Sequence, residues 1–142
     1  MTIAAILNGK GRDVISITAH QSLGDAVALL ATRRIGAVPV MDGPAVVGIF
    51  SERDVIHALS EHGAAALDRK VGDVMTAPAI TVGPSEAVIG ALSLMTRRRI
   101  RHLPVLEAGR VIGVVSIGDL VKYRIDRIEA DAEAMRSYIQ SA

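Results

Sequence analysis

The residues best suited to ligand chemistry stand in two short segments with the same pattern, Gly-x-x-Ser-x-x-Asp. The first segment carries Ser51 and Asp54, and the second carries Ser116 and Asp119. Because each serine follows an apolar run and precedes a helical pattern, it marks a helix start, where free N–H groups and the helix dipole favour a phosphate or ribose oxygen. The aspartate adds two acceptor oxygens, which can take both hydroxyls of a ribose. The same spacing is also typical of a capping box, in which the serine and the acidic residue satisfy backbone donors and bind nothing.

The two segments belong to an internal repeat. A shift of 65 residues, which moves Pro39 onto Pro104, aligns two long stretches of the chain without a gap. Further matching positions are Ala26 and Ala91, Leu29 and Leu94, Arg33-Arg34-Ile35 and Arg98-Arg99-Ile100, Val40 and Val105, and Gly48 and Gly113. Such a repeat indicates two copies of one supersecondary unit, neither of which can bury its apolar face alone.

Each copy is predicted to contain a strand, a helix, two further strands and a second helix. Runs rich in β-branched residues predict the first strands at 14–18 and 79–82. The segments Ser22-Leu23-Gly24-Asp25 and Pro84-Ser85-Glu86 predict the helix starts, and apolar residues at three- and four-residue steps follow them. The later strands, joined in pairs by hairpin turns, are predicted at 37–41, 46–50, 102–106 and 111–115.

These elements predict an α/β fold in which two β-α-β-β-α repeats pack as one pseudo-symmetric module. We place the first repeat at 1–70, with its core at 14–59, and the second at 71–142, with its core at 79–124. A C-terminal helix is predicted at 120–140. Its apolar residues follow the spacing of a helix that packs on another helix, and they are Ile125, Ile128, Ala132, Met135 and Ile139.

Composition excludes several classes of function. The chain has 16 basic and 15 acidic residues, so its formal net charge is +1 and no overall field draws it to nucleic acid or to an anionic membrane. The absence of cysteine excludes a disulfide framework, a thiolate metal site and a cysteine nucleophile. No apolar run approaches the length of a membrane-spanning helix. We therefore expect a cytoplasmic protein with no membrane partner.

The repeated unit resembles the CBS (cystathionine-β-synthase) domain. The resemblance rests on two features that occur together twice: an apolar-x-x-apolar-Pro strand, at Ile35–Pro39 and Ile100–Pro104, and the Gly-x-x-Ser-x-x-Asp turn after it. Paired CBS domains are regulatory modules in inosine-monophosphate dehydrogenases, chloride channels and the γ subunit of AMP-activated kinase. The resemblance implies a stand-alone regulatory module that binds an adenosyl ligand and has no catalysis of its own. The sequence does not distinguish AMP, ADP, ATP, NAD(H), S-adenosylmethionine or a cyclic dinucleotide.

The resemblance also implies two ligand clefts, each of which joins the ribose-binding turn of one copy to the base- and phosphate-binding strands of the other. Cleft one is expected to contain Ile49, Ser51, Arg53, Asp54, Ala79, Ile80, Arg101, His102 and Pro104. Cleft two is expected to contain Val14, Ile15, Gly36, Ala37, Pro39, Val114, Ser116, Gly118 and Asp119. Because Arg53 and Arg101 can bind phosphate oxygens and cleft two offers no side-chain cation, we expect the more highly charged ligand in cleft one.

Two other functions fit the sequence less well. The run Arg97-Arg98-Arg99 could be a nucleic-acid patch, but no aromatic residues are interleaved for base stacking, and cations also favour a helix C-terminus. Catalysis or a metal site would need grouped residues, whereas the four histidines lack ligand-like spacing and no Gly-rich loop ends in Gly-Lys-Ser/Thr. We therefore expect no catalytic residues, no metal and no nucleic-acid partner.

A scaffold that dimerises and binds a partner protein without a ligand remains an open alternative. CBS pairs commonly dimerise into a flat disc, so the resemblance implies a homodimer, and the apolar seam of the C-terminal helix would add a contact. The sequence does not identify the protein target. Coupling between ligand binding and dimer or partner affinity would favour the sensor, and a dimer unchanged by nucleotides would favour the scaffold.

Overall fold

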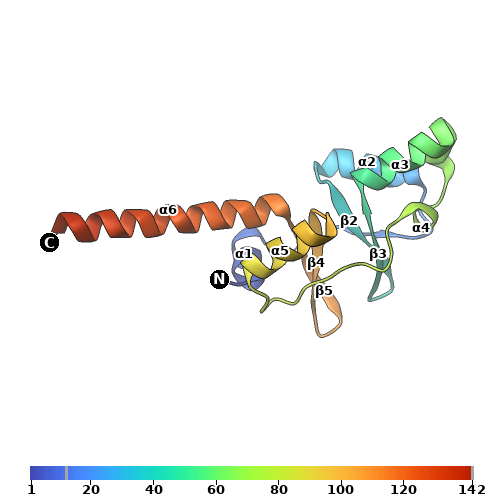
Figure 1. Cartoon of the computed structure of the whole chain (residues 1–142). Coiled ribbons are helices and arrows are strands. Elements are labelled where there is room, and N and C mark those ends of the chain that lie inside the picture. The colour runs from blue at the N-terminus through green and yellow to red at the C-terminus, as the bar shows by residue number, and fades with distance from the viewer. Residues whose placement is uncertain (12, 142) are drawn as a thin grey trace.

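The computed structural model describes residues 1–11 and 13–141, which form two similar units side by side and one long helix that projects from them (Figure 1). The first unit contains β1 (Ile17–Thr18), α2 (Leu23–Arg33), β2 (Ala37–Asp42), β3 (Ala45–Ser51) and α3 (Glu52–His62). The second contains α5 (Val88–Arg98), β4 (His102–Glu107), β5 (Arg110–Ser116) and α6 (Ile117–Ser141). The remaining elements are α1 (Ile3–Lys10), the 3-10 helix η1 (Gly63–Asp68) and α4 (Val71–Val74). The predicted α/β fold with two repeats and a C-terminal helix is confirmed.

Each unit is built on a hairpin with the same register. β2 pairs antiparallel with β3 and parallel with β1, and β4 pairs antiparallel with β5. Val40 lies opposite Gly48 in the first hairpin, and Val105 lies opposite Gly113 in the second. A register shift follows both pairs, so the 65-residue repeat of the sequence is also a repeat of the backbone.

The first strand of each repeat is shorter than predicted. Of 14–18 only Ile17–Thr18 is a strand, and of 79–82 only Val82 forms a bridge, to Val105. The Val82 N–H donates to the Pro104 carbonyl at 3.1 Å, so the next step of the parallel ladder would need an N–H from Pro104. Proline has no N–H to donate, which ends the pairing there, and Pro39 has the same place in the first repeat.

The start of α5 also differs from the prediction. Pro84-Ser85-Glu86 forms a turn, and the helix begins at Val88, with Ala87 as its N-cap. The 65-residue shift aligns Ala87 with Ser22, whose hydroxyl accepts the Asp25 N–H at 3.1 Å at the start of α2. An alanine side chain cannot accept this bond, so the sequence offered no capping residue at the true start.

The helix that precedes each repeat in the sequence packs in the apolar core of the other repeat. α1 packs on the second unit, where three of its residues are buried together with residues of α5, β4 and β5; they are Ile3, Ile6 and Leu7. α4 in turn contributes Val71 to the core of the first unit. The boundaries 1–70 and 71–142 follow the order of the chain, whereas each core takes one helix from across that boundary.

The C-terminal helix is longer than predicted and leaves the body of the protein. It begins at Ile117 rather than at 120, so Asp119 lies in its first turn. Leu120 is buried in the second core, but from Ile125 to Ser141 every residue except the half-buried Ala132 is exposed. Within residues 1–11 and 13–141, no helix has both the length and the apolar character needed to span a membrane.

Candidate functional site

The first Gly-x-x-Ser-x-x-Asp turn lies at the junction of β3 and α3. Ser51 is the N-cap of α3, and Asp54 Oδ2 accepts the Ser51 N–H at 2.8 Å and the Ser51 hydroxyl at 3.2 Å. The two residues form a capping box, which satisfies free donors at the start of the helix. Asp54 therefore has a structural role, and any ligand role depends on what else reaches its carboxylate.

Residues from beyond the first repeat reach this turn. The hydroxyl of Thr76, in the segment that leads into the second repeat, donates to Asp54 Oδ1 at 2.9 Å. The backbone of Thr76 also pairs with that of Ile49 through two bonds of 2.9 Å. Arg53 Nη1 donates to the carbonyl of Arg99, at the end of α5, at 2.9 Å. The turn of the first repeat is thus bonded to the segment after α4 through Thr76, and to the end of α5 in the second unit through Arg53.

The second turn has similar geometry at the junction of β5 and α6. The Ser116 N–H donates to Asp119 Oδ2 at 2.9 Å, and the Asp119 N–H donates to Ser116 Oγ at 3.1 Å. Lys10, at the end of α1, reaches this carboxylate: its Nζ lies 2.6 Å from Asp119 Oδ2 and donates to the Val114 carbonyl at 2.8 Å. The residues predicted for cleft two include no side-chain cation, and Lys10, which lies outside that set, bonds to its member Asp119.

The Lys10 ammonium influences the ionisation of Asp119. Burial alone would raise the pKa of Asp119, but hydrogen bonds from Lys10 and Ser116 and the charge of Lys10 outweigh burial. The pKa of Asp119 is therefore lowered from its usual 3.8. The two side chains are 42% and 27% exposed, so this ion pair is open to solvent.

His102 lies between the two predicted sets of residues. We expected it in cleft one, but its ring packs against Gly36, a cleft-two residue: a Cβ on Gly36 would lie 3.1 Å from His102 Cε1. The carboxylate carbon of Glu52 would lie 3.7 Å from the same Cβ, so these three residues meet where the repeats touch. Burial lowers the pKa of His102 from its usual 6.5, and the negative charge of Glu52 opposes that shift.

Comparison with known proteins decides the family. The family model of the CBS domain matches residues 11–61 and 71–126, which include both Gly-x-x-Ser-x-x-Asp turns. This chain belongs to the CBS domain family. The CBS domain-containing protein CBSX3, mitochondrial, of Arabidopsis thaliana is 34% identical to it over an alignment that covers 98% of this chain and 72% of the relative.

Solved structures of other CBS proteins have the same fold. The CBS-domain containing protein ATU1752 from Agrobacterium tumefaciens superposes with a TM-score of 0.85 at 39% identity, and the match covers 87% of this chain and 99% of that protein. The CBS domain protein PAE2072 from Pyrobaculum aerophilum, solved in complex with AMP, has a TM-score of 0.75 at 26% identity. That match covers 84% of this chain and 89% of the relative. The resemblance stated from the sequence is confirmed.

The other predicted site residues of the CBS pair differ in their exposure. Four half-buried residues lie before or at the first strands of the two repeats: Val14, Ile15, Ala79 and Ile80. Three buried residues lie on the central strands: Ala37, Pro39 and Pro104. Arg101 and Gly118 are exposed. The hydrogen bonds of the two turns described above involve Ile49, Arg53, Asp54, Val114 and Asp119 of the predicted sets.

Three further residues near the turns escaped the sequence analysis: Lys10, Glu52 and Thr76. For Lys10 the reason is an offset in the repeat. Leu7 packs over Gly113 as Met75 packs over Gly48, and Leu7 and Met75 are 68 residues apart rather than 65. A gapless shift of the sequence therefore misses the correspondence between α1 and α4. A comparison that allows a gap before each first strand would have revealed the apolar helix in front of both repeats.

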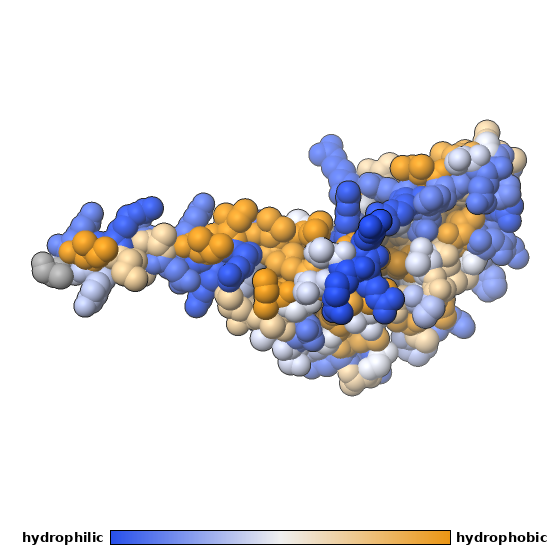
Figure 2. Space-filling model, in the orientation of Figure 1, coloured by the Kyte–Doolittle hydropathy of each residue, from blue (hydrophilic) through white to orange (hydrophobic). Residues whose placement is uncertain are grey.

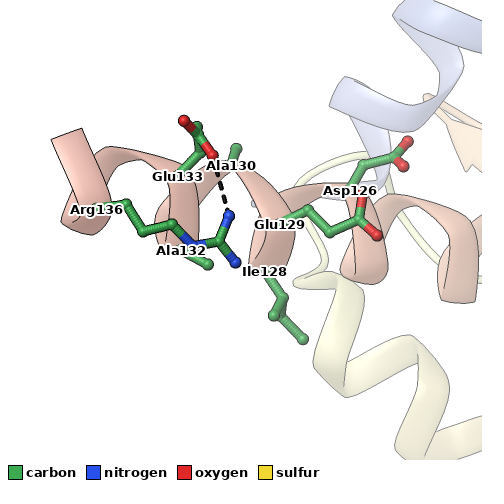
Figure 3. A pocket seen from close by; sticks show the side chains of 7 residues that line it. All are labelled: Asp126, Ile128, Glu129, Ala130, Ala132, Glu133 and Arg136. Carbon is green, nitrogen blue, oxygen red and sulfur yellow. Dashed lines mark hydrogen bonds and ion pairs between the residues drawn. The ribbon is translucent and has the colours of Figure 1, made fainter.

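Two surface hollows are present among residues 1–11 and 13–141, and neither is lined by the Ser–Asp pairs of the two turns. One is lined by seven residues between Asp126 and Arg136, all of them on α6, so a single helix cannot enclose a ligand there (Figure 3). The other lies on the first CBS repeat, between α2 and α3, and includes Gly36 and Glu52 but neither Ser51 nor Asp54. The candidate ligand site therefore rests on the two turns and their contacts.

Proposed function

We propose that this chain is a regulatory CBS pair that binds an adenosyl ligand in two clefts between its repeats. The observation that carries the proposal is the repeated Ser–Asp turn, whose carboxylate is reached each time by the segment that precedes the other repeat in sequence, through Thr76 at Asp54 and through Lys10 at Asp119. A ribose would bind the aspartate carboxylate through its two hydroxyls, beside the N-terminus of a helix that favours a phosphate oxygen. The complex of the Pyrobaculum relative with AMP supports this class of ligand.

The balance of charge favours different ligands at the two clefts. The residues proposed for cleft one include two guanidinium groups, on Arg53 and Arg101, and one carboxylate, on Asp54. In cleft two the ammonium of Lys10 is already paired with Asp119. Glu52, next to Gly36, adds a further negative charge there. We therefore propose that cleft one takes the more highly charged nucleotide, such as AMP, ADP, ATP or NAD(H), and cleft two a less charged adenosine compound.

Regulation would follow from contact with both repeats. A ligand that touches both repeats stabilises the arrangement that it binds better, and it can change only those surfaces that differ between the arrangements. α6 begins at the Ser116 turn, so a shift at cleft two would move the base of the projecting helix. We propose that the protein acts by such a shift, on a protein target in the cytoplasm, and not by catalysis of its own.

Calorimetric titration tests the proposal. AMP, ATP, NADH and S-adenosylmethionine would be titrated into the unmodified chain and into the Asp54→Asn and Asp119→Asn variants, with Asp25→Asn as the matched control. Asp25 is an exposed acidic residue in the first turn of α2, so its variant controls for the loss of charge at a helix start. We expect Asp54→Asn to weaken binding of the charged nucleotide by at least roughly tenfold and Asp25→Asn to leave binding unchanged. The absence of heat and of any rise in Tm with all four ligands would contradict the proposal.

A ligand-independent scaffold is the second candidate, because exposed apolar side chains lie along the length of α6 and could bind a partner protein. The two functions make different predictions for the oligomer. A scaffold keeps the same oligomeric state with and without nucleotide, whereas a sensor couples the two equilibria and changes them reciprocally. Sedimentation of the chain with and without saturating ligand would distinguish them.

A further inference from the structure

The projecting part of α6 exposes an apolar face that nothing in the described chain covers. Four of its large apolar side chains are between 49% and 65% exposed: Ile125, Ile128, Met135 and Ile139. Figure 2 shows separate apolar groups among charged residues along the projecting helix. α6 has 25 residues and is therefore about 37 Å long. Because most helices in proteins depend on the packing of an apolar face, a free helix of this length lacks its main source of stability.

The spacing of the face identifies the kind of partner. With Val121 included, the apolar positions on α6 alternate between steps of four and three residues, and they are Val121, Ile125, Ile128, Ala132, Met135 and Ile139. A mean step of about 3.5 residues keeps these side chains on one line only if the helix winds around another helix in a left-handed supercoil. The partner is therefore another long helix with the same repeat, which a second copy of this chain provides.

We propose that α6 forms a parallel two-stranded coiled coil with α6 of a second copy of this chain. In heptad terms Ile125, Ala132 and Ile139 take the a positions. Val121, Ile128 and Met135 take the d positions. The proposal does not depend on whether a nucleotide binds.

The flanking charges favour the parallel direction. In a parallel pair, a residue just before an a position faces the residue five positions later in the other helix. This rule pairs Arg124 with Glu129 of the second copy, and Asp131 with Arg136 of the second copy. Both pairs are of opposite charge, and each occurs twice in the dimer.

The antiparallel direction brings like charges together. Each of the six apolar positions of α6 forms one layer of the proposed coiled coil. If all six layers pair in the antiparallel direction, Ile128 lies opposite Ala132 of the second copy, and Glu129 lies beside Glu129 of the second copy. Lys122 likewise lies beside Arg136 of the second copy. A shift by one heptad relieves this repulsion, but it leaves two of the six layers without a partner layer.

The ion pairs that these charged side chains make within α6 are too weak to compete strongly with ion pairs to a second copy. Arg136 bonds to Glu133 at 3.0 Å and Arg127 approaches Asp131 at 4.0 Å, and all four side chains are more than half exposed. Such exposed pairs contribute little to stability. In Figure 3, Ile128 and Ala132 project from one side of α6 while Glu133 lies on the other.

Single-cysteine cross-linking tests the proposal directly, because the chain contains no cysteine of its own. In a parallel pair Ile128 faces its own counterpart, within the Cα separation that a disulfide can span. We expect Ile128→Cys to give a disulfide-linked dimer under mild oxidation. Ala130→Cys, on the outer side of the helix, is the matched control and should remain monomeric on a denaturing gel. The proposal is overturned if Ile128→Cys does not cross-link, or if Ala130→Cys cross-links equally well.

Charge reversal supplies a second test in the Ile128→Cys background. Glu129→Arg should slow cross-linking roughly fivefold, because it places a second guanidinium group beside that of Arg124 of the opposite copy. Adding Arg124→Glu restores opposite charges and should restore the rate. A cross-linking rate that is the same with and without both changes would rule out the parallel pair. So would a cross-link that forms only between Ile128→Cys and Ala132→Cys chains, because these residues lie opposite each other in the antiparallel pair. Circular dichroism of each variant confirms that the exposed substitutions leave the fold intact.

Discussion

Lys10 Nζ lies 2.6 Å from Asp119 Oδ2, and this ion pair joins the first helix of the chain to the last. Lys10 ends α1, which packs on the second repeat, and Asp119 stands in the first turn of α6. At the other turn Asp54 Oδ1 accepts the neutral hydroxyl of Thr76 instead. The two turns thus share their capping geometry but differ in charge, so the two proposed clefts are not equivalent.

Replacement of Lys10 should change the ionisation of its partner. Lys10→Met removes a hydrogen bond and a positive charge from Asp119 while burial remains, so the pKa of Asp119 should rise. A titration of the Asp119 carboxyl carbon by NMR measures the effect. Lys122→Met, on the exposed face of α6, is the control and should leave that pKa unchanged.

The same substitution should alter stability in acid. Since the pKa of Asp119 in the folded chain lies below its usual 3.8, the ionised carboxylate stabilises the fold above that pH. This stabilisation is lost as the pH falls through the folded pKa. Lys10→Met should therefore make the fall of Tm below about pH 4 shallower. An unchanged Asp119 pKa together with an unchanged acid slope would show that Lys10 does not control this carboxylate.

His102 should make stability depend on pH nearer neutrality. Burial lowers the pKa of His102 from 6.5, so between the folded pKa and 6.5 the unfolded chain binds the proton more tightly than the folded chain does. Stability should therefore fall as the pH drops from 6.5 toward the folded pKa and level off below it. His102→Gln should remove this component from a plot of Tm against pH. His20→Gln, at an exposed position, should not, and equal plots for the two variants would contradict the assignment.

Gly48 should be the more sensitive of the two matching strand glycines. A Cβ at Gly48 would lie 2.7 Å from Met75 Sδ and 2.8 Å from the Thr76 carbonyl oxygen, which is part of the backbone. At Gly113 the three atoms nearest a Cβ all belong to the Leu7 side chain, with Cδ2 at 2.6 Å, and none of them is backbone. We expect Gly48→Ala to destabilise the protein by about 1–3 kcal/mol and Gly113→Ala by less. Denaturant unfolding of the two variants provides the comparison, and equal losses would contradict it.

The hairpins and turns followed from the sequence because their signals are local. The proline in the first strand of each hairpin and the three-residue step from Ser51 to Asp54 each act within one segment, and both signals occur in both repeats. The same prolines could also have shown that the first strands are short, since Pro39 and Pro104 have no N–H for the ladder.

The contacts at the site depend on a feature that no local pattern records. Lys10 reaches Asp119 only because α1 and α4 cross over to the opposite cores. The two helices are offset from the 65-residue repeat, and α4 is only four residues long, which is too short for periodicity to reveal. The position of His102 against Gly36 likewise depends on how the two repeats pack, which the sequence of either repeat does not state.

Moving a cation between the turns tests the proposed difference between the clefts. Arg53 in α3 corresponds to Gly118 in α6, and a Cβ at Gly118 would meet only Ser116 Oγ, at an ordinary 3.6 Å. Arg53→Ala should weaken AMP binding at cleft one by roughly tenfold and leave adenosine binding nearly unchanged, because a guanidinium acts on the phosphate.

The reciprocal variant, Gly118→Arg, should strengthen AMP binding at cleft two and make it more dependent on salt. Gly118→Gln is the matched control, since it adds a side chain of similar reach without the charge. Both variants place a better helix-forming residue in the first turn of α6, so their Tm values should rise by similar amounts. A difference in AMP affinity between the two variants then reports on the charge and not on stability. If AMP and adenosine affinities change by the same factor in Gly118→Arg and Gly118→Gln, the charge at this position does not select the ligand, and the proposed division of ligands between the clefts is wrong.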